Sequence, residues 1–375
     1  MSAVVELLKE LVAIPSMNPM EKMDASGAYC EHYAAEFVAE ELKRTGLDVE
    51  IYDVEPNRPN VVAMMDVHAE RTLMLEAHLD TVHAEGMTVA PFVPLVKDGR
   101  VYGRGACDTK GSLAAFMTAI GVLAEQRKGM KFNVMLAAAV DEESGFKGAA
   151  SLVGRGMKAD MAIVGEPTQL HIVRAHKGVV RWRVHTTGLA AHSAYPRRGR
   201  NAIYTMGRVI QRLESHASAL EEIAPHADLG TPSLSIGTIS GGRVVNIVPD
   251  RCTIEVDRRT LPGESKESVL ALARAALEDV TEWGFEPPFL AIEGIDVDLH
   301  APIVALLSEA IEQVTGPAIV ECAHYATDAG HYNRAGIPSI VFGPGDIAQA
   351  HTADEYIDAA QLEQAVAIIT RLIGE

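Results

Sequence analysis

Histidine and carboxylate side chains stand at the ends of several apolar runs in this 375-residue sequence. His78 ends the run at 72–77, and Asp80 follows two residues later, on the same side of an extended chain. Such an acceptor would fix the tautomer of a metal-binding imidazole and raise its basicity. A histidine near an aspartate at a strand end is also common without metal, so this pair indicates a metal site only if other segments support it.

Asp108 lies in a second segment of this kind, the string Gly103-Arg-Gly-Ala-Cys-Asp-Thr-Lys-Gly-Ser. The glycines of this string permit a tightly constrained backbone. The string lacks the spacing of a phosphate-binding P-loop, because Lys110 precedes its glycine, and nucleotide binding is therefore not expected. The remaining alternatives for Asp108 are a metal ligand and an acid that caps the following helix.

The third segment is an apolar run at 133–140 that ends in the adjacent acids Asp141, Glu142 and Glu143. Neighbouring residues that leave a strand point in different directions, so two of these carboxylates can serve two purposes. One can bind metal while the other transfers a proton. The alternative is a solvated acidic loop before a helix, where the helix dipole favours acids.

Glu166 follows the apolar run at 161–164, and His351 lies in a loop after the run that ends at Phe342. All these candidates lie at or just beyond the carboxyl ends of expected strands, where open α/β sheets place their sites. Two imidazoles and three carboxylates suit two divalent cations with one bridging carboxylate; zinc is the expected metal, with cobalt and manganese as alternatives. The two cations would generate a bridging hydroxide that attacks a carbonyl group of the substrate. Glu142 would be the general base and acid.

The pattern of apolar residues divides the chain into three parts, whose helices and strands would position these side chains. Residues 1–176 alternate helical patterns with short apolar runs, which predicts an α/β layer with a mostly parallel sheet. Residues 177–294 alternate apolar and polar positions, which predicts an inserted α+β domain with one covered face. Residues 295–375 again alternate helical patterns with apolar runs, which predicts that they complete the first domain. The expected helices are 4–12, 29–45, 202–213, 266–280, 302–314 and 359–373, and the expected strands are 49–54, 60–65, 72–77, 133–140, 161–164, 180–187, 234–239, 253–256 and 337–342.

The acidic composition limits the partners of the protein. Lys and Arg number 33 and Asp and Glu number 51, and the resulting net charge of -18 repels phosphate backbones and anionic lipid. No run approaches the roughly 18 apolar residues of a membrane span, and the N-terminus lacks the features of a signal peptide. The cysteines form no C-x-x-C pair and are interpreted as reduced thiols. We therefore expect a cytoplasmic protein that binds neither nucleic acid nor membrane.

Six motifs follow one another along the chain: Ala77-His-Leu-Asp-Thr-Val, Gly103-Arg-Gly-Ala-Cys-Asp-Thr-Lys-Gly, Asp141-Glu-Glu-Ser-Gly, Val164-Gly-Glu-Pro, Ala191-His-Ser-Ala-Tyr-Pro, and Gly343-Pro-Gly-Asp followed by His351. In this order they resemble the motifs of the M20 metallopeptidase family, which includes acetylornithine deacetylases, succinyl-diaminopimelate desuccinylases and glutamate carboxypeptidases. The likeness extends over nearly the whole chain. The resemblance implies a zinc-peptidase-like catalytic domain with an inserted dimerisation or lid domain, and hydrolysis of a linear amide or peptide bond.

The resemblance implies a role for each candidate residue and a cis peptide bond after the bridging aspartate, between Asp108 and Thr109. The implied roles are His78 and Glu166 on the first metal, Glu143 and His351 on the second, Asp108 bridging the two, Asp80 behind His78, and Glu142 as acid and base.

The same resemblance implies roles for residues of the insert. His192 would reach into the active site of a partner subunit and stabilise the tetrahedral oxyanion, so a homodimer through the insert is expected. Asn246 and Arg259 match substrate-binding positions, and a guanidinium suits carboxylate recognition because it donates two parallel hydrogen bonds. The adjacent Arg258 is the alternative to Arg259. Capping of a helix by His192 and support of a turn by Asn246 are the structural alternatives.

Two strings bear on the substrate. His176-Lys-Gly-Val stands where desuccinylases carry Arg-Arg-Gly-Ser, which argues against diaminopimelate chemistry. This string and the loop around His351 are more similar to acetylornithine deacetylases, and they favour an N-acyl amino acid with a free α-carboxylate. The alternatives are an M20 dipeptidase or carboxypeptidase and, more remotely, a non-catalytic homologue that binds metal or amino acid. That last alternative predicts loss of a ligand or of the base, and the sequence keeps them all.

Overall fold

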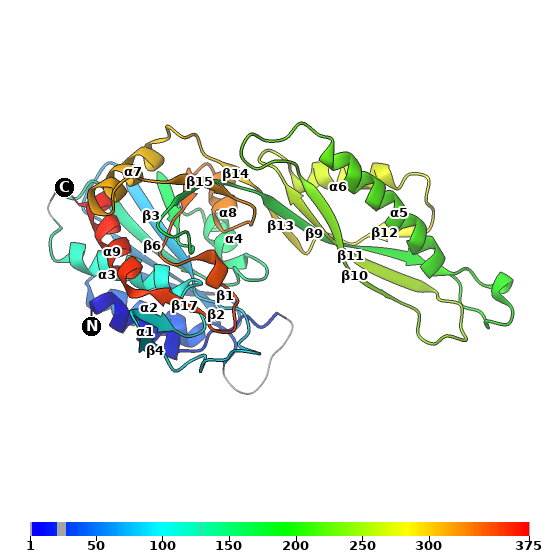
Figure 1. The fold of residues 1–375 in the computed structure, drawn as a ribbon, viewed down its shortest axis with the longest axis horizontal. Coiled ribbons are helices and arrows are strands. Elements are labelled where there is room, and N and C mark those ends of the chain that lie inside the picture. The colour runs from blue at the N-terminus through cyan, green and yellow to red at the C-terminus, as the bar shows by residue number, and fades with distance from the viewer. Residues whose placement is uncertain (1, 21–27, 128, 375) are drawn as a thin grey trace. The chain divides into compact units, whose positions relative to one another are not determined.

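The computed structural model describes residues 2–20, 28–127 and 129–374. The chain forms two compact units: unit 1 comprises Met1–Arg174, Val297–Glu321 and Thr327–Glu375, and unit 2 comprises Ala175–Asp296 and Cys322–Ala326. Figure 1 labels the elements of both units. Within the described residues, no helix has the length and apolar character needed to cross a membrane.

Unit 1 is built on a mixed sheet with the strand order β1-β2-β6-β3-β7-β16-β8. The central strands β6, β3, β7 and β16 are parallel, which confirms the predicted mostly parallel centre, whereas β1, β2 and β8 pair antiparallel. The central strands are nearly continuous apolar runs, as expected for strands that are covered on both faces. The bounds are β1 Asp48–Glu55, β2 Arg58–Met65, β3 Thr72–His78, β6 Asn133–Ala139, β7 Met161–Val164, β8 Ile172–His176 and β16 Ser339–Val341.

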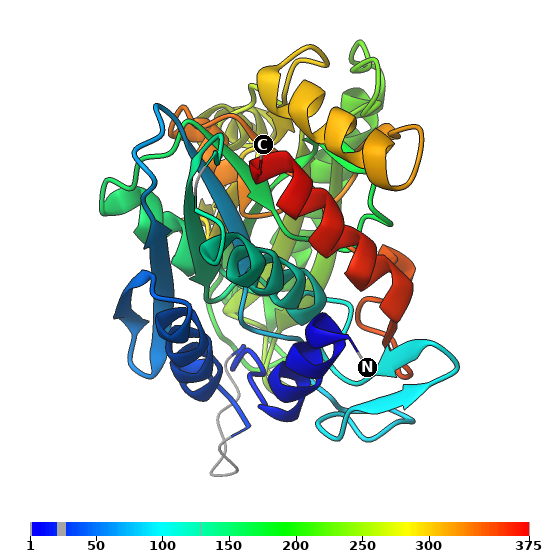
Figure 2. The same ribbon diagram turned by 90° about the vertical axis from the view of Figure 1, so that its left-hand side faces the viewer.

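Helices cover both faces of this sheet (Figure 1). On one face α3 contacts α1, α9 and β3, and Figure 2 shows α9 in red beside α3. The sequence of α3 is apolar on nearly every side, which explains why the helix is buried along most of its length. On the other face α4 packs on α8, and α8 packs on β7 and β16. The bounds are α1 Ala3–Ala13, α2 His32–Arg44, α3 Lys110–Ala124, α4 Lys147–Gly154, α7 Pro302–Val314, α8 Ala329–Arg334 and α9 Ala359–Ile373.

Unit 1 also contains a small sheet that the apolar pattern did not predict. It has the order β17-β5-β4, with β4 at Leu95–Lys97, β5 at Arg100–Tyr102 and β17 at Tyr356–Asp358. Strands of three residues are too short to display a period of two. This sheet brings the segment that follows His351 next to the loop that precedes Asp108, since the Gly103 amide donates to the Glu355 carbonyl at 3.1 Å.

Unit 2 has an antiparallel sheet in the order β10-β11-β9-β12, with β13 also paired to β9. Alternate residues of β9 and β11 face the helices α5 and α6, and these residues form the core of the unit. The expected helix at 202–213 continues to Glu221, while the one expected at 266–280 ends at Ala276, where the Trp283 indole donates to the Leu277 and Val280 carbonyls. The bounds are β9 Gly178–Thr187, α5 Ala202–Glu221, β10 Ser233–Gly241, β11 Arg251–Thr260, α6 Lys266–Ala276, β12 Trp283–Phe285 and β13 Leu290–Ile292. The short strands β14 Ile295–Asp296 and β15 Val320–Ala323 are not part of this sheet, because they pair with β8 of the larger sheet.

Candidate dinuclear metal centre

The candidate residues converge at one edge of the unit 1 sheet. His78 is the last residue of β3 and lies opposite Ala139, the last residue of the parallel strand β6. β6 leads into the loop that contains Glu142 and Glu143, and β7 is followed by Glu166. Parallel strands end at the same edge of a sheet, so side chains that are far apart in the sequence meet there.

Asp108 lies between two imidazoles. Its Oδ1 is 3.2 Å from Nε2 of His78, and its Oδ2 is 3.2 Å from Nε2 of His351. Nε2 of His351 is also 3.1 Å from Oε2 of Glu143, and Nε2 of His78 is 3.8 Å from Oε1 of Glu166. The structure therefore brings together the five residues that the sequence proposes as metal ligands.

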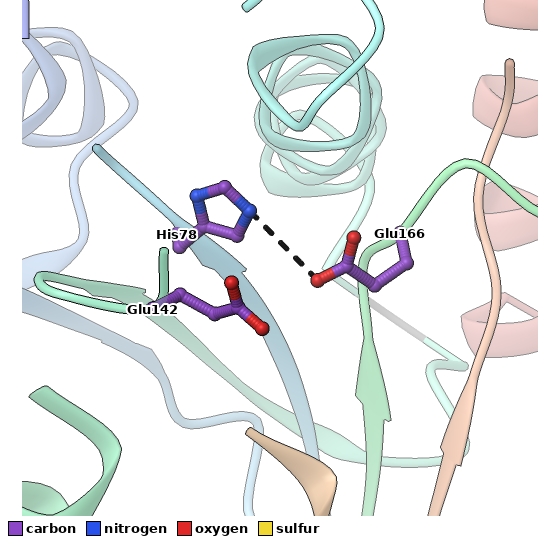
Figure 3. A group of neighbouring side chains, drawn as sticks. All are labelled: His78, Glu142 and Glu166. Atoms are coloured by element: carbon purple, nitrogen blue, oxygen red, sulfur yellow. Dashed lines mark ion pairs between the residues drawn. The ribbon is translucent and has the colours of Figure 1, made fainter. Parts of the chain in front are cut away.

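Glu142 and Glu143 point toward different partners. Donor atoms of His78, Glu142 and Glu166 lie within 4.8 Å of one another, and so do donor atoms of His78, Asp108 and Glu143. Figure 3 shows the carboxylates of Glu142 and Glu166 directed toward the His78 ring, with the His78–Glu166 ion pair dashed. Two adjacent acids thus reach two groups of side chains, as the spacing predicts.

The carboxylate of Asp80 lies closer to the backbone amides of Glu142 and Glu143 than to the imidazole of His78. Nδ1 of His78 lies 2.8 Å from the backbone carbonyl of Asp80 and 3.7 Å from its carboxylate. The carboxylate accepts hydrogen bonds from the backbone amides of Glu142 and Glu143, each at 3.1 Å. Asp80 therefore fixes the ring through its carbonyl and fixes the loop of the two acids through its side chain.

Two residues that the sequence did not single out hold this loop in place. The Asn18 side-chain amide donates to Asp80 at 2.8 Å and to Asp141 at 3.0 Å. The buried Arg58 donates to Asp141 at 2.8 Å and, through two nitrogens, to the buried carboxylate of Glu31. Asn18 lies outside the strands and Arg58 begins β2, and both reach Asp141 from far away in the sequence, so their sequence positions give no signal of these contacts.

The peptide bond between Asp108 and Thr109 is cis, which confirms that prediction.

Burial and charge change the proton affinity of the cluster. Burial and the charge of Asp108 raise the pKa of Glu143 to about 7, while hydrogen bonds to Asp108 and Glu143 raise the pKa of His351 to about 10. Burial and the charge of Glu166 raise the pKa of Glu142 above its usual value. Cations placed among these groups would favour ionised carboxylates and neutral imidazoles, because metal ligands must be deprotonated.

The donor set fits two divalent cations. Two ligands of a tetrahedral zinc ion, each bound at ~2.1 Å, are separated by roughly 3.4 Å. The N···O separations in the cluster run from 3.1 to 3.8 Å, and the two oxygens of Asp108 face different imidazoles, as a bridging carboxylate requires. Imidazole and carboxylate donors accept zinc, cobalt and manganese alike.

The other predicted residues lie in unit 2. His192 and Asn246 are exposed and stand on adjacent segments, because the Ser193 amide donates to the Asn246 carbonyl at 3.0 Å. Nδ1 of His192 accepts from the Ala194 amide at 3.1 Å, which forms a local turn rather than a helix cap.

The two adjacent arginines of β11 differ in exposure. Arg258 is buried and its guanidinium binds Glu264 at 2.7 Å. Arg259 is partly exposed and pairs with Asp257 at 2.9 Å. Arg259 is therefore the arginine of the two that a dissolved ligand can reach.

Known proteins show similarity to this chain in sequence and in fold. The chain is 35% identical over 310 residues to an acetylornithine deacetylase of Myxococcus xanthus, covering 80% of this chain and 79% of the relative. It is 32% identical to the acetylornithine deacetylase of Edwardsiella ictaluri, covering 98% of this chain and 96% of the relative.

Two solved structures share the fold at low sequence identity. The M20 family metallo-carboxypeptidase of Sulfolobus solfataricus matches with a TM-score of 0.79 at 19% identity, covering 99% of this chain and 98% of that one. A dinuclear metal-binding peptidase of the M20 family from Bacillus subtilis matches with a TM-score of 0.69 at 18% identity, covering 98% and 96%. Residues 74–375 match the family described as peptidase family M20/M25/M40. The chain belongs to this peptidase family, and it is a hydrolase of amide bonds.

Proposed function

We propose that the protein hydrolyses the amide bond of an N-acyl amino acid, as an acetylornithine deacetylase-like enzyme with two zinc ions. The observation that supports this proposal most directly is Asp108, whose two oxygens face His78 and His351 separately. His78 and Glu166 would hold one ion, Glu143 and His351 the other, and Asp108 both. The curated relatives named acetylornithine deacetylase favour this substrate class.

The residues around the ions determine where protons move. When bound, the two cations would polarise the substrate carbonyl and lower the pKa of a water molecule at the site. Glu142 accepts the proton of the attacking water and passes it to the departing amine. The Asp80 carboxylate accepts from the backbone amide of Glu142 and so holds the backbone from which the Glu142 side chain extends toward His78 and Glu166.

Unit 2 would act as the dimerisation and lid unit of this enzyme. Its strand β10 is at the edge of the sheet, and the apolar side chains of Tyr204 and Ile239 are exposed, as a surface that pairs with a second copy would be. In the dimer, His192 of one subunit would stabilise the oxyanion in the site of the other, and Asn246 and Arg259 would bind the substrate. The thiols of Cys30, Cys107 and Cys252 are free, which favours a cytoplasmic location.

The substrate assignment is tested by supplying N-acetyl amino acids, dipeptides and tripeptides to the enzyme loaded with zinc, cobalt or manganese. We expect release of acetate from N-acetyl amino acids that retain a free α-carboxylate to give the highest kcat/KM. A preference for dipeptides or for C-terminal cleavage would instead identify a dipeptidase or a carboxypeptidase. Binding of metal without hydrolysis of any of these amides would contradict the proposed function.

The dimeric site predicts complementation between two defective variants. His192→Ala and Glu142→Gln homodimers should each be nearly inactive, whereas a mixed dimer contains one site with an intact Glu142 and an intact His192 from the partner. Random mixing of equal amounts should therefore restore about a quarter of wild-type activity. The measurement is activity after the two variants are mixed and allowed to exchange subunits. Activity that stays at the sum of the separate variants would show that His192 acts within its own chain or not at all.

A further inference from the structure

The backbone amides of the loop that carries Asp108 bind the side-chain carboxylate of Glu355. This side chain is fully buried. Its Oε1 accepts from the amides of Cys107 at 2.9 Å and Asp108 at 3.1 Å. Its Oε2 accepts from the amide of Gly105 at 3.0 Å and from the Arg104 guanidinium at 2.6 Å.

These contacts explain why the string that begins at Gly103 is rich in glycine although it lacks the spacing of a P-loop. Backbone amides that converge in a glycine-rich turn form a concave anion-binding site. Here Gly105 has a φ of +83°, and a Cβ at this position would stand 2.7 Å from the Thr81 side chain, so the turn requires glycine. The anion in the turn is a glutamate from a segment about 250 residues later in the chain, and the loop has no amide left for a nucleotide at these positions.

Glu355 also joins two loops that supply the metal centre. It follows His351 by four residues. Its carboxylate holds the amide of Asp108, while its own backbone carbonyl accepts from Gly103 at 3.1 Å. Arg104 adds a hydrogen bond to the Thr352 carbonyl at 3.4 Å. The relative position of the Asp108 and His351 side chains therefore depends on how one carboxylate is bound.

We propose that Glu355 is a positioning residue that sets the distance between Asp108 and His351 and thereby the affinity for the second metal ion. This inference rests on the proposed dinuclear function. The first ion would share Asp108 with the second, and it would also keep His78, at the end of β3, and Glu166, just after the paired strand β7. The second ion would depend on Asp108 and also on His351, and both belong to loops that Glu355 ties together. Because Glu355 would then affect two ligands of the second ion and one ligand of the first, the second ion is the more sensitive of the two.

The test compares Glu355→Gln with Asp354→Ala, a change of the neighbouring exposed carboxylate. Metal-free protein is titrated with zinc by calorimetry in competition with a chelator, and bound metal is counted after desalting. We expect Glu355→Gln to bind the second ion about 10- to 100-fold more weakly, the usual effect of removing a partner behind a ligand, with the first ion changed much less. Asp354→Ala should bind both ions as wild type does.

A second variant, Glu355→Ala, tests the anion site itself. Removing the side chain leaves three backbone amides and Arg104 around a space that acetate or formate can enter. We expect either anion, at millimolar concentration, to restore much of the affinity for the second ion in Glu355→Ala and to have no such effect on wild type or Asp354→Ala. If Glu355→Ala does not fold, Glu355→Gln alone decides the question.

The outcomes separate the inference from the function on which it rests. Two ions bound normally by Glu355→Gln would overturn the role of Glu355 while leaving the dinuclear site intact. Equal weakening of both ions, or weakening that simply follows a lowered Tm, would also overturn it, because the change would then be a general loss of stability. A wild-type chain that binds fewer than two ions would contradict the proposed function instead.

Discussion

Glu142→Gln should retain two metal ions per chain and lose kcat by about 10²- to 10⁴-fold, the range expected when a general acid–base is removed. The amide keeps the size of the side chain but cannot accept the proton of the attacking water. The backbone conformation of the loop should not change, because Asp80 accepts a hydrogen bond from the backbone amide of residue 142 and not from its side chain. Steady-state kinetics with an N-acetyl amino acid and metal analysis of the same sample provide the measurement.

The adjacent acid is the matched control. Glu143→Gln replaces the carboxylate that lies 3.1 Å from Nε2 of His351 with a neutral amide, and it should lower the occupancy of one metal ion, with activity recovering in part when metal is supplied in excess. Excess metal should have no effect on Glu142→Gln. Donor atoms of Glu142 also lie within reach of His78 and Glu166. Loss of an ion from Glu142→Gln would therefore show that Glu142 is a ligand and that the base is another residue.

Arg58→Met should lower the free energy of unfolding of unit 1 by about 3–5 kcal/mol, the usual cost of leaving buried charges without their partner. Arg58 binds the fully buried Glu31 through two nitrogens and Asp141 through a third. Burial already raises the pKa of Glu31 to about 7 despite the opposing effect of the arginine. Without Arg58 this carboxyl group would have to be protonated or unpaired, and either state destabilises the fold.

Urea denaturation followed by far-ultraviolet circular dichroism measures this loss. Tryptophan fluorescence would miss it, since Trp182 and Trp283 both lie in unit 2. Arg44→Met is the matched control, because Arg44 pairs with Glu41 on an exposed helix surface and should contribute less than about 1 kcal/mol. A loss from Arg58→Met no larger than the control would mean that the buried network is not a major source of stability.

The place of the metal centre could be predicted because its determinants are local. His78, Glu142 and Glu166 each follow an apolar run, and such runs identify strands without knowledge of the rest of the chain. Parallel pairing then brings the ends of these strands to one edge. The α/β class and the parallel centre of the sheet follow from the same local patterns.

The partners behind the metal centre could not be predicted in this way. Asn18 reaches Asp141 across 123 positions, and Arg104 reaches Glu355 across 251. Such contacts depend on where side chains point and on how distant loops approach each other. Neither property leaves a periodic pattern of apolar residues in the sequence. Asp80 illustrates the limit: its spacing from His78 is correct for a partner of the imidazole, yet its carboxylate contacts the amides of residues 142 and 143.

The position of β16 in the sheet has a consequence for biosynthesis. This strand, Ser339–Val341, lies between β7 and β8, both of which begin before unit 2 in the chain. A ribosome therefore finishes residues 175–296 of unit 2 while unit 1 still lacks a central strand and the loop of His351. Domains generally fold as units during synthesis. Under the proposed function, loading of the complete metal site would be confined to chains that have been translated almost to their end, and a prematurely terminated chain would not assemble it.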